Sequence, residues 1–173
     1  YELKAVDELQ LPPAVSVPKL LALHSLGVEY VENYPDDTWW LNKNVVIRHG
    51  NVVRGGEGDT AKAVVNKTTY TTIFGHIHRR ESVSRRIKTR EGHALQTAFC
   101  PGCACHIDGR VPGSSADDNW QQGLAVIEYT DDFENIIPIG VDNGMAMYNG
   151  KVFKAQDREK EINAMLMSKL GGM

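Results

Sequence analysis

Residues 44–78 read NVVIRHGNVVRGGEGDTAKAVVNKTTYTTIFGHIH, and this stretch decides the fold. The apolar run within 44–48 predicts an interior strand covered on both faces. A glycine-rich loop follows, and then a helix capped by Asp59 or Thr60. A second strand of the buried type occupies residues 71–74. Strand, loop, helix and strand in this order predict a βαβ-like unit.

The flanking sequence changes in character from one side of this unit to the other. Upstream, the pattern predicts helices over 3–10 and 19–26 and short strands over 28–31 and 38–41, with the leucines of the second helix forming a stripe suited to packing on a sheet. Downstream, only strand signals are found, at 82–88, 94–99, 123–129, 136–139 and in a hairpin of 145–148 with 151–153. Asn149-Gly150 joins that hairpin and is typical of a type I′ turn. An amphipathic helix over about 156–170 and a frayed tail complete residues 156–173. We therefore predict one α/β domain over 1–173 with a mostly antiparallel, β-rich C-terminal half.

Composition and length exclude several classes of protein. The 173 residues carry a formal charge of -3, and a dedicated nucleic-acid binder would usually be basic. No apolar run approaches the roughly 18 residues that a membrane span needs, and the first residues lack the pattern of a signal peptide. Three cysteines make a poor disulfide framework. We therefore expect a cytoplasmic protein without membrane partners.

Three of the six histidines stand at the ends of predicted strands. His49 ends the strand over 44–48, and His76 and His78 follow the strand over 71–74. Ligands bind at the carboxyl ends of strands in α/β sheets, and two residues at spacing i, i+2 in extended chain point the same way. Three converging imidazoles suit zinc, manganese, iron or nickel. We predict that these three side chains lie within reach of a common ion.

The same residues carry a resemblance to a known family. Gly75-His76-Ile77-His78 is similar to the last signature, Gly-His-x-His, of the calcineurin-like metallophosphoesterases, and His49-Gly50 is similar to the penultimate histidine motif. The segments CPGCAC at 100–105 and WQQG at 120–123 look like the β-rich tail of phage and bacterial members. The resemblance covers about residues 28–153.

This resemblance implies a fold, an activity and a set of metal ligands. The fold would be the C-terminal part of a four-layer α/β/β/α sandwich. The activity would be hydrolysis of a phosphomonoester or phosphodiester by a metal-bridging hydroxide, with two divalent ions (Mn, Zn, Fe or Ni) in the complete site. On the family's pattern, His49 and His76 would bind the second metal and His78 the first. The substrate would be a phosphate ester, including the possibility of a nucleotide or a nucleic acid.

The chain departs from the family in its N-terminal half. The family's motifs Asp-x-His, Gly-Asp-x-x-Asp and Gly-Asn-His-Asp/Glu do not occur upstream of His49. We therefore expect the catalytic acid histidine and the carboxylate ligands to come from a missing N-terminal half, and this chain to be inactive alone. Apolar strands at 45–47 and 72–74 would then face an absent partner, so the chain would self-associate or need that half. The alternative is a non-catalytic remnant that serves binding or assembly.

Three further features allow competing interpretations. Residues 56–61 fit the loose dinucleotide pattern G-x-G-x-x-A, but His76 and His78 stand where an acidic ribose ligand is expected, which favours a flexible loop. Cys100, Cys103, Cys105 and His106 resemble part of a zinc site, but their crowding favours buried thiols. The basic residues after the histidine motif favour a solvated strand face, and the functional alternative is contact with phosphate by Arg79 and Arg80.

Overall fold

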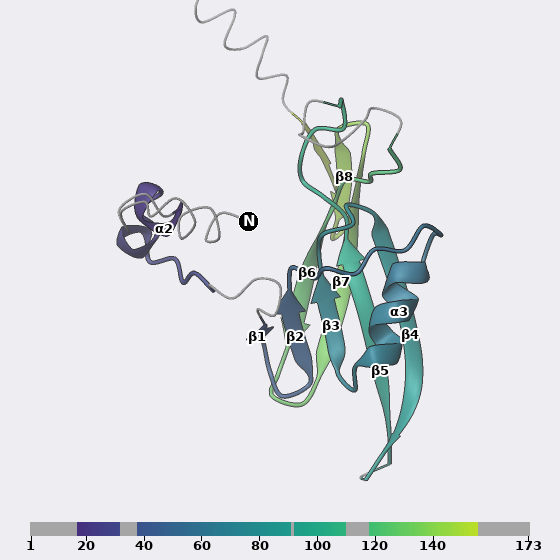
Figure 1. The fold of residues 1–173 in the computed structure, drawn as a ribbon. Coiled ribbons are helices and arrows are strands. Elements are labelled where there is room, and N and C mark those ends of the chain that lie inside the picture. Colours follow the sequence, from purple (N-terminus) through teal and green to yellow (C-terminus); the bar gives the residue numbers. More distant parts are fainter. Residues whose placement is uncertain (1–16, 32–37, 91, 110–117, 156–173) are drawn as a thin grey trace, which may run out of the picture.

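The protein is described by a computed structural model over residues 17–31, 38–90, 92–109 and 118–155. Within these ranges the fold is of the mixed α/β type, with mostly strands, few helices and two sheets (Figure 1). The helices predicted over 3–10 and 156–170, and the tail up to 173, lie outside the described residues. Among the described residues, no helix combines the length and the apolar character needed to cross a membrane.

The first sheet contains the βαβ unit that the sequence predicts. Its order is β1-β2-β3-β5-β4, made of β1 (Trp39–Trp40), β2 (Val45–Arg48), β3 (Thr71–Phe74), β5 (Gly92–Pro101) and β4 (Arg80–Thr89). Strands β2, β3 and β5 are parallel neighbours, whereas β1 and β4 pair antiparallel at the two edges. Helix α3 (Asp59–Lys67) connects β2 to β3, which confirms the predicted unit.

The second sheet is the antiparallel, β-rich part. It consists of β6 (Gly123–Tyr129), β7 (Glu134–Asp142), β8 (Met145–Tyr148) and β9 (Lys151–Lys154), paired in that order. The turn between β8 and β9 has φ angles of 49° at Asn149 and 72° at Gly150. Two successive positive φ angles are the mark of a type I′ turn, so this prediction is confirmed.

Two apolar layers hold these elements together. Between α3 and the first sheet lies a cluster that includes Ala61, Val65 and Phe74. On the other face of the first sheet, Val45, Ile73 and Phe99 meet side chains of β6 and β7. Figure 1 shows α3 on one side of the first sheet and β6 and β7 on the other. The described residues thus form the layers α/β/β.

This layering corrects one expectation. The strands at 45–47 and 72–74 were expected to face an absent partner, but Val45 and Val46 are fully buried and Phe74 is 3% exposed. Helix α3 covers one face of these strands and the second sheet covers the other, so their side chains find partners within this chain.

The N-terminal part also differs from the prediction. One helix over 19–26 is expected, but the structure has α2 (Val17–Leu20) and the 3₁₀ helix η2 (Leu23–Leu26). Ala22 between them has a left-handed backbone with φ of 51°, which no α-helix accommodates. Leu20 and Leu26 are 65% and 71% exposed, so the predicted packing of this stripe on a sheet is wrong. The strand expected at 28–31 is absent from these described residues.

Candidate metal centre

His49 and His76 meet at the ends of two parallel strands. The register pairs Arg48 of β2 with Phe74 of β3, so both strands end at the same level. The Gly75 N–H donates to the His49 carbonyl oxygen at 2.9 Å and continues the pairing by one step. As a result, His49 Nε2 lies 3.2 Å from His76 Nδ1, with the ring planes at 74°.

This separation suits two ligands of one ion. Zn–N bonds are about 2.0–2.1 Å, so two nitrogens 3.2 Å apart subtend about 100° at a shared ion, close to a tetrahedral or octahedral angle. In the structure, one of the two nitrogens donates a hydrogen bond to the other, with the direction set by the tautomers. Metal binding would replace this hydrogen bond, with one lone pair from each ring directed at the ion.

The loop that carries His76 and His78 has an unusual backbone. An extended chain is expected here, but this is wrong: φ is 73° at His76 and 56° at His78. The Ile77 N–H donates to the Gly75 carbonyl oxygen at 2.9 Å, which closes a tight γ-turn around His76. A left-handed residue other than glycine costs about 1–2 kcal/mol, and such strain persists only where the surroundings enforce it.

Ile77 is one of the groups that enforce this backbone. Its side chain is 7% exposed and belongs to the core cluster beneath α3. The apolar residue between the two histidines therefore anchors the loop, while the histidines on either side remain partly accessible.

His78 lies near the other two histidines but contacts Trp120. The two rings are T-shaped with centroids 4.1 Å apart, and the Gln121 N–H donates to the His78 carbonyl oxygen at 2.8 Å. Trp120 was not foreseen as a site residue, because 42 residues separate it from His78 and no local pattern connects them. Among the residues that the structure describes, no group of three or more His, Cys, Asp or Glu side chains is arranged to hold a metal ion.

Electrostatics keep two of these imidazoles neutral. Burial, followed by the charges of His76 and His78, lowers the pKa of His49 below its usual value of 6.5. Burial, followed by the charge of His76, also lowers the pKa of His78. A histidine must be neutral to bind a metal, so both shifts favour ligation at neutral pH.

Arg79 and Arg80 are each paired with a carboxylate of this chain. Arg79 contacts Glu81 at 3.1 Å, and its side chain is only 15% exposed. Arg80 reaches Asp142 at 3.0 Å across to the second sheet. A Cβ atom at Gly140 would overlap the Arg80 guanidinium, so the glycine provides the room for this crossing. The structure thus gives both arginines a role within the fold, and their contact with a substrate phosphate stays a prediction.

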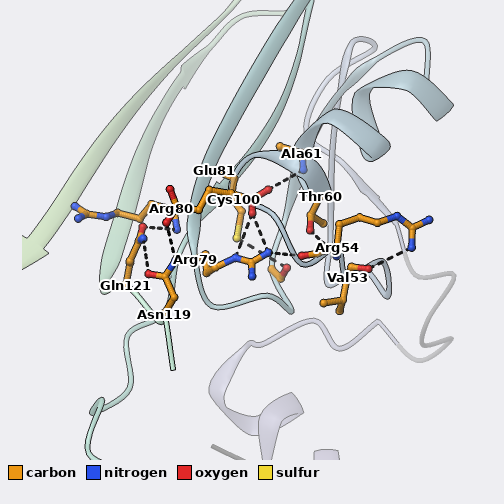
Figure 2. A network of polar contacts seen from close by, with 12 residues as sticks. Val53, Arg54, Thr60, Ala61, Arg79, Arg80, Glu81, Cys100, Asn119 and Gln121 are labelled. Carbon is orange, nitrogen blue, oxygen red and sulfur yellow. Dashed lines mark hydrogen bonds and ion pairs between the residues drawn. The ribbon is translucent and has the colours of Figure 1, made fainter. Parts of the chain in front are cut away.

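Glu81 is the central residue of a buried polar network beside the histidine loop (Figure 2). Its Oε2 accepts the backbone N–H of Ala61 at 2.9 Å, within the first turn of α3. A carboxylate is favourable at this end of a helix, and here it occupies the position that a dinucleotide phosphate would need. Because Glu81 already binds this end of α3, the structure disfavours the interpretation of the glycine-rich loop as a dinucleotide site.

The cysteines lie beside this network as free thiols. Cys100 and Cys103 are buried, in agreement with the interpretation of these residues as buried thiols at a strand end. Cys105 is partly exposed. Burial is the main cause that raises the pKa of Cys100 to about 11, and burial also raises the pKa of Cys103. Both thiols are therefore protonated at neutral pH in the metal-free protein.

Comparison with known proteins found no relative: no family model, no curated protein and no solved structure gave a significant match.

Proposed function

We propose that this chain is the C-terminal part of a metal-dependent phosphoesterase of the calcineurin-like kind. The observation that carries the proposal is the 3.2 Å approach of His49 Nε2 to His76 Nδ1 at the ends of two adjacent parallel strands. These two histidines would hold one divalent ion, and His78 would turn from Trp120 to bind the other.

The histidines present fit such an ion in chemistry as well as in spacing. Imidazole nitrogens suit Zn, Mn, Fe and Ni, and the lowered pKa of His49 and of His78 means that protons compete weakly for the ligand atoms. When bound, a pair of such ions supplies a nucleophile at neutral pH and stabilises the charge on the phosphoryl oxygens. The role of this chain is to hold His49 and His76 at the ends of adjacent strands, with His76 and His78 on a strained loop anchored by Ile77.

The complete site needs ligands that the described residues do not bring to it. Two divalent cations at short range repel strongly unless anionic ligands compensate, and neutral imidazoles provide no negative charge. We infer that Asp and Asn ligands and an acid histidine come from an additional N-terminal segment. The isolated chain is then expected to bind one ion weakly and to hydrolyse little or no phosphate ester.

The layer architecture and the free cysteines agree with this proposal. An added helical layer on the outer face of the second sheet would complete the four layers α/β/β/α, and that face carries apolar residues such as Leu124, which is 53% exposed. A cytoplasmic location would suit the three free cysteines of the described residues.

The direct test is metal binding by the chain itself. Titration calorimetry with Zn²⁺ should show one site for the wild type, and His49→Ala and His76→Ala should each weaken it at least tenfold. His93→Ala is the matched control, because His93 is an exposed histidine at the start of β5 and should leave the affinity unchanged. Equal binding by the wild type and both site variants would contradict the proposal.

A non-catalytic binding module is the second candidate. The observation in its favour is that Arg79 and Arg80, the two cations that directly follow His78 in the sequence, are both ion-paired within the chain. The upstream coding sequence distinguishes the two candidates. Motifs of the Asp-x-His and Gly-Asp-x-x-Asp type directly upstream favour the enzyme, and a start codon near Tyr1 favours the module.

A further inference from the structure

We propose that Arg79 and Glu81 are positioning residues that hold the His76–His78 loop in its left-handed backbone and so set the geometry of the metal centre. The expected effect on metal affinity rests on the proposed function. The effect on the backbone of His76 and His78 does not, and it can be tested without metal.

The first step is that both carboxylate oxygens of Glu81 accept hydrogen bonds inside the protein. Its side chain is 3% exposed. Oε1 accepts from Arg79 Nε at 3.2 Å and from Arg79 Nη2 at 3.1 Å, while Oε2 accepts from the Ala61 N–H at 2.9 Å. A buried carboxylate with both oxygens engaged has little freedom, and it fixes the guanidinium in one orientation.

The second step is that Arg79 joins segments that contribute different histidines. Besides binding Glu81, its Nη2 donates to the Arg54 carbonyl oxygen at 2.7 Å. Arg54 lies in the loop that begins at His49, and its own N–H donates to Thr60 Oγ1 at 3.0 Å in the first turn of α3. Figure 2 shows the three elements meeting around the Arg79 guanidinium. Arg79 thus ties the His76–His78 loop to the His49 loop directly and to α3 through Glu81 and Arg54.

The third step is the position of Arg79 immediately after the strained residues. His76 and His78 have positive φ, and Ile77 anchors the loop from within. Arg79 restrains the same loop on its C-terminal side, one residue from His78. Without the ion pair, the backbone after Ile77 would be free to relax to an ordinary conformation, and the imidazoles would lose their arrangement.

Strand β4 offers a matched control at the other end of α3. Arg85 donates to Gln96 Oε1 at 2.9 Å and to the Thr68 carbonyl oxygen at 2.9 Å. Like Arg79, it donates from Nε to a buried side chain and from Nη2 to a backbone carbonyl oxygen, but it lies within β4, bonds an amide in place of a carboxylate, and stands at the helix end away from the histidines.

The experiment compares Arg79→Met with Arg85→Met. Both should lower the melting temperature. Only Arg79→Met should weaken Zn²⁺ binding, by about tenfold or more, the range seen when groups that orient metal ligands are removed. Arg79→Lys, which keeps the charge but not the fork of donors, should fall between them. A folded Arg79→Met variant with wild-type affinity would overturn the inference while leaving the proposed function intact.

A metal-free measurement keeps the inference separate from the proposed function. In the apoprotein, NMR coupling constants and Cα shifts report whether His76 and His78 keep positive φ. We expect that backbone in the wild type and in Arg85→Met, and its loss in Arg79→Met. Retention of positive φ in Arg79→Met would refute the positioning role even if no variant bound Zn²⁺. If Arg79→Met does not fold, Glu81→Gln, which removes only the charge, is measured in the same way.

Discussion

His76 and His78 illustrate at the scale of single residues how sequence and structure diverge at this site. Both are histidines, and a residue other than glycine seldom adopts a left-handed backbone, yet both adopt one. The cost of about 1–2 kcal/mol for each is a noticeable share of the 5–15 kcal/mol that stabilises a typical domain. The fold tolerates it because Ile77 is buried between them. Strain retained against such a cost is typical of a functional loop.

Cysteine reactivity gives a prediction at the same scale. With its pKa near 11, only about one Cys100 thiol in a thousand is ionised at pH 8, and the side chain is fully buried. Iodoacetamide at pH 8 should therefore label Cys105, the partly exposed thiol, long before Cys100. Peptide mass spectrometry measures the order of labelling. Labelling in urea is the control, in which the cysteines should react alike, and early labelling of Cys100 in the native protein would contradict the structure.

The raised pKa of Cys100 also has a consequence for stability. The folded chain keeps the Cys100 proton up to about pH 11, whereas an unfolded thiol loses it near its usual pKa of 9.0. The unfolded state therefore binds fewer protons between these pH values, and stability should fall as pH rises from 9 to 11. Below pH 9 this thiol should contribute no pH dependence.

At the scale of secondary structure, helix α3 depends on a buried amide at its C-terminal end. Gln96 of β5 is 1% exposed, and its Nε2 donates to the Thr68 carbonyl oxygen at 2.8 Å and to Thr68 Oγ1 at 2.7 Å. Gln96→Met would remove this donor from the half-buried Thr68 acceptors and would also remove the Oε1 acceptor of Arg85, at a cost of about 1–3 kcal/mol. Urea denaturation measures the loss.

Thr97→Val is the control for this prediction. Thr97 is the next residue of β5, and its Oγ1 hydrogen bond to Ser84 Oγ at 2.8 Å is exposed to solvent. Loss of a solvent-exposed bond should cost no more than about 0.5 kcal/mol. Equal losses in the two variants would show that Gln96 does not stabilise the helix end.

The same elements show what could be predicted from the sequence. Strands β2 and β3 and helix α3 were predictable because apolar runs are local signals, and two of the histidines meet because parallel strands end at one edge. The predicted cap at Asp59 or Thr60 is wrong, because Gly58 is the N-cap and makes no side-chain capping hydrogen bond. The contact of His78 with Trp120 was not predictable, because it joins distant segments. The role of Glu81 was missed for the same reason, since its partner Ala61 is 20 residues away. The break at Ala22 has no sequence signal that we identify.

At the scale of the whole molecule, the second sheet presents an apolar outer face. Cross-strand pairs place Leu124 beside Ile139 and Val126 beside Ile137. The alternate residues of β6 and β7, including Ile127 and Ile136, turn inward to the first sheet. The outer pairs therefore face away from the core that the described residues form, with Leu124 exposed and the other three half-buried. An exposed apolar patch is typical of an interface.

We therefore predict that the purified chain self-associates at micromolar concentration through this face. Leu124→Lys, at a position 53% exposed, should shift sedimentation velocity toward the monomer without lowering the melting temperature, because the side chain is not part of the core. Leu20→Lys is the control: Leu20 is 65% exposed in α2, apart from both sheets, so association should be unchanged. A monodisperse wild-type monomer would show that the outer face needs no partner, and the argument for a missing layer would fail with it.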